Sequence, residues 1–159
     1  MMVTAEERRS AIAKIRVLPE QAEAAVKGLS EKQLDTPYGE DKWTPRQVIH
    51  HLADSRMNAI VRVKLILTED HPTLKPYDQE EWAKTQDASG PVDSSLAILK
   101  GLHARWSAWM ESAPESAWAR SAYHPENGEM RLDDLLKVYA KHGESHVGQI
   151  TALRARNGW

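Results

Sequence analysis

Three histidines carry the strongest chemical signal in the sequence. His142 and His146 are four residues apart, so on a helix their rings project from one face with Cβ atoms about 6 Å apart. That spacing lets two imidazoles bind one divalent ion at the usual Zn–N distance of about 2.0–2.1 Å. The same spacing also arises by accident or from simple hydrogen bonding, so the pair alone does not establish a metal site.

A third histidine comes from a helix expected over about residues 44–67. On a helical wheel, His51 lies about 60° from the edge of the apolar sector, on the side of Ser55, whereas His50 lies about 170° from the sector's centre. We therefore predict that His51 looks into the fold and that His50 faces solvent. Three histidines with an open fourth position are the pattern of a catalytic zinc site. The sequence thus predicts one divalent metal held by His51, His142 and His146.

The other polar candidates have weaker signals. Asp54 lies one turn after His51. Its carboxylate can orient a metal-binding side chain without binding the metal itself, or it can remain exposed on the surface. His71, His103 and His124 lie near loops or on a polar helix flank, so we expect surface or capping roles, although the loop of His124 can border the site. Four further side chains are candidates for substrate contact: Asn58, Arg62, Tyr77 and Asp78.

The elements that must position these side chains are four long helices. Apolar residues at helical spacing indicate helices over about 4–29, 44–67, 94–112 and 132–156. Thr4 and Thr44, each with Glu or Gln three residues later, form capping boxes, whereas Pro19 can kink or split the first helix. In the last helix, His142 and His146 occupy positions on the apolar face where Leu would be expected. Burying two imidazoles is costly unless their nitrogens are satisfied, and a metal would satisfy them.

Residues 72–92 lie between the second and third helices and contain four prolines or glycines. We predict a long crossover loop with a helical turn near 78–83, and a loop of this length is uncommon unless it covers a functional site. Asn127-Gly128 predicts a small hairpin over about 123–130. Together these patterns predict an all-α four-helix bundle, with residues 1–159 as a single domain.

Composition narrows the class of protein. The chain has 159 residues and a net charge of −2, which argues against a dedicated nucleic-acid binder. It has no cysteine, so any metal must be bound by His, Asp, Glu or water. Neither a signal peptide nor an apolar run long enough to span a membrane is evident, so a cytoplasmic protein is expected. The sequence has six Trp and no Phe, and we expect most of the Trp side chains in the core and at its rim.

The chain has a set of short motifs at 34–38, 43–55, 67–70, 75–78, 123–125 and the final His142-x-x-x-His146. Together they resemble the motifs of the DinB/YfiT-like superfamily, in particular its YfiT-type metal-dependent hydrolases. The resemblance implies a four-helix bundle, often a homodimer, with a nickel or zinc site whose ligands match His51, His142 and His146. The family often has further His between the last two ligands, where this chain has Gly143, Glu144 and Ser145.

Two reactions and one non-catalytic role follow as expectations. A metal on three histidines can lower the pKa of bound water and give hydrolysis, or it can bind a low-molecular-weight thiol as thiolate for S-transfer to a small electrophile. The resemblance implies bacillithiol or mycothiol for the second reaction, and the absence of Cys fits both. The alternative is a non-catalytic helical module with a structural metal or none. A structural zinc normally has four protein ligands, and Glu144 is a weak candidate for the fourth.

Overall fold

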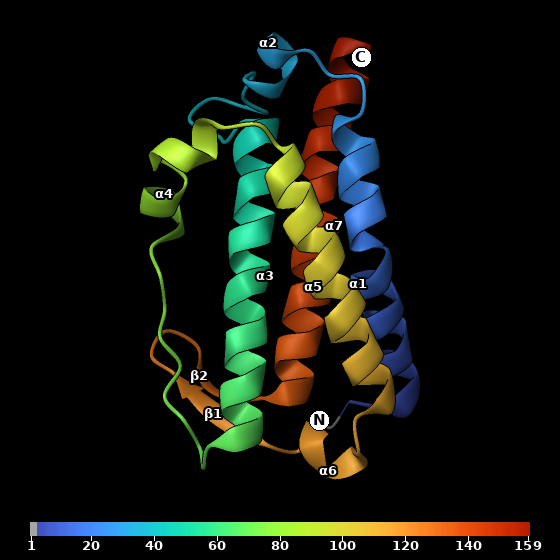
Figure 1. The fold of residues 1–159 in the computed structure, drawn as a ribbon, viewed down its shortest axis with the longest axis vertical. Coiled ribbons are helices and arrows are strands. Elements are labelled where there is room, and N and C mark those ends of the chain that lie inside the picture. Colours follow the sequence, from blue (N-terminus) through green and yellow to red (C-terminus); the bar gives the residue numbers. More distant parts are fainter. Residues whose placement is uncertain (1–2) are drawn as a thin grey trace.

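The computed structural model describes residues 3–159 as a bundle of four long helices that lie side by side (Figure 1). These are α1 (Ala5–Val26), α3 (Pro45–Thr68), α5 (Asp93–Ser112) and α7 (Leu132–Asn157). Shorter elements connect them: α2 (Glu31–Leu34), α4 (Gln79–Trp82), the 3-10 helix η1 (Gln86–Ser89), α6 (Glu115–Trp118), β1 (Ser121–His124) and β2 (Gly128–Arg131). The predicted all-α bundle is therefore confirmed.

The direction of the helices explains the long crossover. In Figure 1, α1 and α7 run one way along the long axis, whereas α3 and α5 both run the other way. Both α1 and α3 pack against α5 and α7. Because α3 and α5 are parallel neighbours, the chain must travel the length of the bundle between them, and residues 69–92 do so along the outside of α3.

Local sequence signals set the helix ends. Capping boxes form at Thr4, Ser30 and Thr44, where each hydroxyl accepts from the backbone N–H three residues later. The helix α1 continues through Pro19, which is buried, so the predicted alternative of a split first helix is wrong. At the end of the bundle where α1 and α7 begin, Arg8 donates to both carboxylate oxygens of Asp133, at 2.9 and 3.0 Å, and so joins the starts of these two helices.

The hairpin is slightly longer than predicted and anchors the crossover. Strands β1 and β2 are antiparallel, with Tyr123 opposite Glu129. The backbone of Tyr123 also exchanges hydrogen bonds with the crossover, accepting from Leu74 and donating to Pro72. The start of the crossover is therefore held against the end of the bundle that carries the hairpin.

The apolar core has two halves with polar side chains between them. One half includes Ile15, Ala59, Trp106 and Tyr139, and the other includes Leu18, Leu52, Leu99 and Ile150. On α3, α5 and α7, polar residues lie at or next to the boundary between these halves, namely His51, Ser55, Arg56, His103, His142 and His146. Residues that can do chemistry are thus concentrated in a layer near the middle of the bundle.

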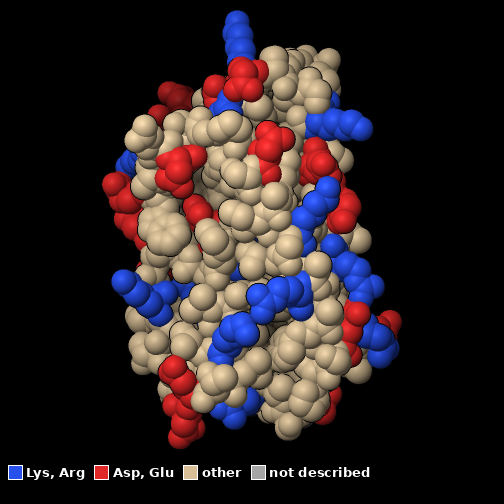
Figure 2. Space-filling model, in the orientation of Figure 1, with Lys and Arg blue, Asp and Glu red and all other residues tan. Residues whose placement is uncertain are grey.

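The surface gives no sign of a membrane span. Among the described residues, no helix combines the length and the apolar character needed to cross a bilayer. Figure 2 shows basic and acidic side chains together on one face of the molecule, consistent with the small net charge of −2.

Candidate metal centre

The three predicted ligands meet where α3 packs against α7. The Nε2 atoms of His51 and His142 are 3.0 Å apart. One ring nitrogen from each of His51, His142 and His146 lies within 4.8 Å of the other two. The ring centroids are 4.4–5.0 Å apart, so the three imidazoles surround one small volume.

The donor atoms fit a divalent ion. A tetrahedral ion with bonds of about 2.0–2.1 Å places its ligand atoms about 3.3–3.4 Å apart, close to the observed separation of the two Nε2 atoms. Nδ1 of His142 is also buried without a hydrogen-bond partner among residues 3–159. A ligating histidine normally donates its second ring N–H to a carbonyl, carboxylate or water, and His142 has no such partner among these residues.

A hydrogen bond fixes the orientation of His146. Its Nδ1 lies 2.8 Å from Oε1 of Gln149, and because the amide oxygen only accepts, Nδ1 carries the proton. The lone pair of His146 is then on Nε2, which is the state needed for metal binding at that atom. Sequence reasoning missed Gln149, although its spacing of three residues from His146 on a helix was a usable signal.

The surroundings keep the three rings uncharged. Burial is the main cause that lowers the pKa of His51 to about 3 and that of His142 to about 2, and the neighbouring His146 and Arg56 lower both further. Burial also lowers the pKa of His146, although the bond to Gln149 opposes this effect. At neutral pH all three histidines are therefore in the deprotonated form that binds metals.

Trp43, in the loop before α3, packs against the site and is bonded to the crossover. The indole ring is 6.0 Å from the ring of His146 and nearly parallel to it, and it is 4.6 Å from the ring of His51. Its Nε1 donates to Glu80 on α4 at 2.9 Å, and the Gln47 amide donates to the Ala83 carbonyl. Trp43 therefore forms one wall of the site, and crossover residues Pro76, Tyr77 and Gln79 line a cavity together with His142.

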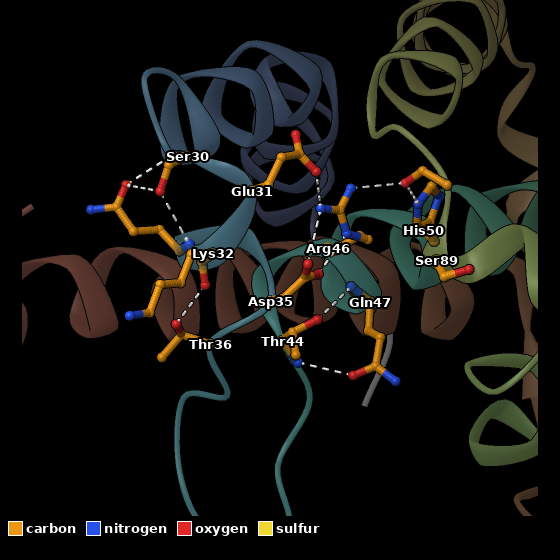
Figure 3. Close-up of polar contacts among 12 residues, drawn as sticks. Ser30, Glu31, Lys32, Asp35, Thr36, Thr44, Arg46, Gln47, His50 and Ser89 are labelled. Atoms are coloured by element: carbon orange, nitrogen blue, oxygen red, sulfur yellow. Dashed lines mark hydrogen bonds and ion pairs between the residues drawn. The ribbon is translucent and has the colours of Figure 1, made fainter.

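His50 faces away from the cluster but is not on the surface, so the prediction of a solvent-facing side chain is wrong. It is buried, with Nδ1 2.7 Å from Oγ of Ser95 and Nε2 3.0 Å from the carbonyl of Gly90. In Figure 3, Arg46 and His50 reach toward the same segment after η1, and Arg46 also donates to the Gly90 carbonyl. A wheel drawn for α3 alone omits the crossover and α5, which bury this face.

His103 is a second correction. We expected a surface or capping role, but the side chain is buried, and its Nδ1 donates to the carbonyl of Ile15 at 2.6 Å. The bond links α5 to the middle of α1, where the backbone partner could not be inferred from helical spacing. His71 is exposed as expected and lies 2.9 Å from the Glu129 carboxylate.

The remaining candidates divide between local roles and a small cavity. Asp78 caps α4, and Asn58 donates to the backbone carbonyl of Asp54. Within the described part of the chain, no hydrogen bond joins the Asp54 carboxylate to the three histidines, and Glu144 pairs with Lys14 at 3.0 Å instead. The cavity next to His142 is lined by Arg62, Tyr77 and His124, among others.

Tryptophans occupy the core and its edges as expected, with one exception. Trp106 and Trp118 are buried, and Trp43 and Trp109 are half-buried. Trp82 on α4 is 39% exposed and contacts Tyr77, with ring centroids 4.5 Å apart. Its role is to pack within the crossover, outside the core.

Comparisons with known proteins agree with this architecture. A family model described as the DinB superfamily matches residues 15–150. A "Putative metal-dependent hydrolase" from Geobacillus kaustophilus is 51% identical, over 93% of this chain and 84% of its own length. A protein with the same description from Geobacillus thermodenitrificans is 48% identical, over 98% of this chain and 88% of its own length.

Two solved structures share the fold. YfiT from Bacillus subtilis, described as "a probable metal-dependent hydrolase with an unusual four-helix bundle topology", superposes with a TM-score of 0.96 at 38% identity, covering 99% of this chain and 91% of its own. A mycothiol-dependent maleylpyruvate isomerase superposes with a TM-score of 0.72 at 14% identity, covering 94% and 63%. The second likeness concerns the fold alone.

Proposed function

We propose that this chain, which belongs to the DinB superfamily, is a metal-dependent hydrolase of small molecules. In this proposal His51, His142 and His146 bind one divalent ion. The observation that carries this proposal is the convergence of three uncharged imidazoles on one point, with Nε2 of His51 and His142 3.0 Å apart. Relatives at 48–51% identity that are described as metal-dependent hydrolases support it.

The protein supplies three of the four ligands of a tetrahedral ion, which is the composition of catalytic zinc sites. Such an ion, when bound, acts as a Lewis acid and lowers the pKa of the water that it holds. Imidazole ligands suit both zinc and nickel, and we propose one of these as the metal.

The chain's own residues prepare the site for that chemistry. Gln149 holds His146 in the tautomer with a free Nε2, and burial keeps His51 and His142 deprotonated. Trp43 and the crossover segment that it binds cover one side, which limits the access of bulk water. We also propose a homodimer, which the family resemblance implies and which light scattering after size-exclusion chromatography would test.

The test compares hydrolysis with thiol transfer in the same protein. Zinc-loaded and nickel-loaded protein is incubated with small ester and amide substrates, with and without a low-molecular-weight thiol such as bacillithiol or mycothiol. We expect turnover without thiol, its loss in His142→Ala, and its retention in the control His71→Ala, since His71 is exposed and paired only with Glu129.

The other outcomes each reject this proposal in favour of a different one. Turnover of an electrophile that requires the thiol would identify an S-transferase instead of a hydrolase. Stoichiometric metal with no turnover under either condition would identify a non-catalytic metal-binding module.

A further inference from the structure

A small cavity adjoins the proposed metal centre. It has a volume of about 180 Å³ and lies between α3, α7, the start of the crossover and the hairpin turn, with His142 in its lining. Four larger hollows lie elsewhere on the molecule, but their linings contain none of the three histidines. This cavity is therefore the place where a group of a substrate would lie next to the metal.

Arg62 brings a positive charge to the wall of this cavity. Its Nη1 donates to the phenol oxygen of Tyr139 at 3.1 Å, and its Nη2 donates to the carbonyl of Lys75 at 2.9 Å. These two bonds hold the guanidinium in place and use two of its five N–H groups. Because the Tyr139 oxygen accepts from Arg62, the phenol proton remains available for an acceptor in the cavity.

His124 adds a second fixed donor. Its Nδ1 accepts from the backbone N–H of Glu126 at 3.2 Å and lies 3.1 Å from the Asn127 side-chain nitrogen. Burial and the nearby Arg62 lower the pKa of His124, so the ring is neutral at pH 7. A neutral ring that accepts at Nδ1 carries its proton on Nε2, which makes His124 a hydrogen-bond donor from that atom.

The lining of the cavity contains one cationic side chain, Arg62, and one acidic side chain. The acidic residue of the lining is Glu126, which is exposed at the turn. Behind Tyr139 lies Arg56, which is fully buried, donates to the Tyr139 carbonyl, and has Nε and Nη1 without partners among residues 3–159. The guanidinium groups of Arg62 and Arg56, and the ion when bound, thus place positive charge on the inner side of the cavity, and such an arrangement favours an anion.

We propose that this cavity is a substrate subsite for a small carboxylate-type oxyanion, held by Arg62, Tyr139 O–H and His124 Nε2–H beside His142. The inference rests on the proposed function, because it assigns the substrate of the hydrolase as a small molecule with an anionic group next to the bond that is cleaved. The paired Arg62 and Tyr139 give the specificity, since a neutral isostere would leave the half-buried Arg62 guanidinium without a counter-charge in the cavity.

Isothermal titration calorimetry tests this subsite with benzoate as the probe and benzamide as its neutral isostere. We expect zinc-loaded protein to bind benzoate at least tenfold more tightly than benzamide. Arg62→Met should weaken benzoate binding by about tenfold to a hundredfold, the range expected for hydrogen bonds to a charged group. Tyr139→Phe, which keeps the ring and its packing, should weaken it by about threefold to tenfold.

Arg120→Met is the matched control. Arg120, like Arg62, donates two hydrogen bonds from its guanidinium, here to the backbone carbonyls of Ile66 and Glu69, but it lies outside the lining of this cavity. It should leave the preference for benzoate unchanged. Zinc content is measured in every variant, so that loss of the metal is not mistaken for loss of the subsite.

Equal binding of benzoate and benzamide would overturn the proposal, as would benzoate binding that survives both Arg62→Met and Tyr139→Phe. Metal-free protein separates this failure from failure of the proposed function. Arg62 and His124 do not depend on the metal, so metal-free protein should keep a weaker preference for benzoate that Arg62→Met abolishes. If no metal binds at all and that preference remains, the subsite stands and the hydrolase proposal fails.

Discussion

Two adjacent histidines on α3 have opposite surroundings, although the sequence presents them as equivalent. His51 faces His142 across the helix interface, whereas both ring nitrogens of His50 have partners in Ser95 and Gly90. A metal ligand needs a free lone pair on the side of the ion, and only His51 meets that condition. This difference determines which of the two histidines contributes to the proposed site.

Removing each of these histidines should therefore have different effects. His51→Ala should weaken zinc binding by at least a hundredfold, because it removes one of three ligands. His50→Ala should change zinc affinity less than tenfold, although it will lower stability by about 1–3 kcal/mol because the hydroxyl of Ser95 loses a buried partner. Competition with a chromogenic chelator measures both affinities. Similar losses of zinc affinity in the two variants would show that the assignment is wrong.

At the scale of helices, the close approach of α7 to α1 and α3 depends on Gly143. A Cβ at this position would lie 2.7 Å from Leu18 Cδ2 and 2.8 Å from Arg56 Nη2. The glycine between the two proposed ligands thus lets the backbone of α7 pack closely enough for His142 to reach His51. The packing thus explains why a side chain is not accommodated at position 143.

Gly143→Ala should destabilise the protein by about 1–3 kcal/mol through overpacking. Gly148 is the matched control on the same helix, because a Cβ there meets nothing within 4 Å. Gly148→Ala should instead stabilise the protein by about 0.5–1 kcal/mol, since alanine has the higher helix propensity. Urea denaturation of both variants measures the difference, and equal effects would contradict the packing argument.

Much of the fold and part of the site could be predicted from these elements. Helical spacing selected His142 and His146 and preferred His51, and the capping boxes marked the starts of α1 and α3. The burial of His50 and His103 could not be predicted, because it depends on what packs against each helix. The cavity also escaped prediction as a unit, since Arg62, Tyr77 and His124 come together only when α3, the crossover and the hairpin meet.

For the whole molecule, the buried histidines make the free energy of unfolding depend on pH. Burial lowers the pKa of His103 to about 4, below its ordinary value of 6.5. Between these two values the unfolded chain binds a proton that the native protein does not bind. The contribution of His103 is therefore fully present above pH 6.5 and is lost as the pH falls toward 4, and it amounts to about 3 kcal/mol at most.

Metal-free protein should accordingly become less stable as the pH falls below 6.5. His103→Gln keeps a hydrogen-bond donor for the Ile15 carbonyl but does not titrate, so its stability should fall less steeply over this range. Denaturant unfolding at pH 7.5, 6 and 5 measures the slopes. The exposed His71, whose pKa is raised by Glu129, serves as the control, and His71→Gln should not reduce the slope. An unchanged slope in His103→Gln would contradict the assignment of a neutral buried ring.

The central claim is that the three histidines hold one divalent ion. The most direct measurement is the zinc and nickel content of the protein, purified without chelator and then titrated with each metal, for wild type and His142→Ala. The structure predicts one ion per chain in the wild type and its loss in His142→Ala, because that variant removes the ligand that faces His51 at 3.0 Å. A wild-type protein that binds no stoichiometric metal, or a variant that retains it, would contradict the claim.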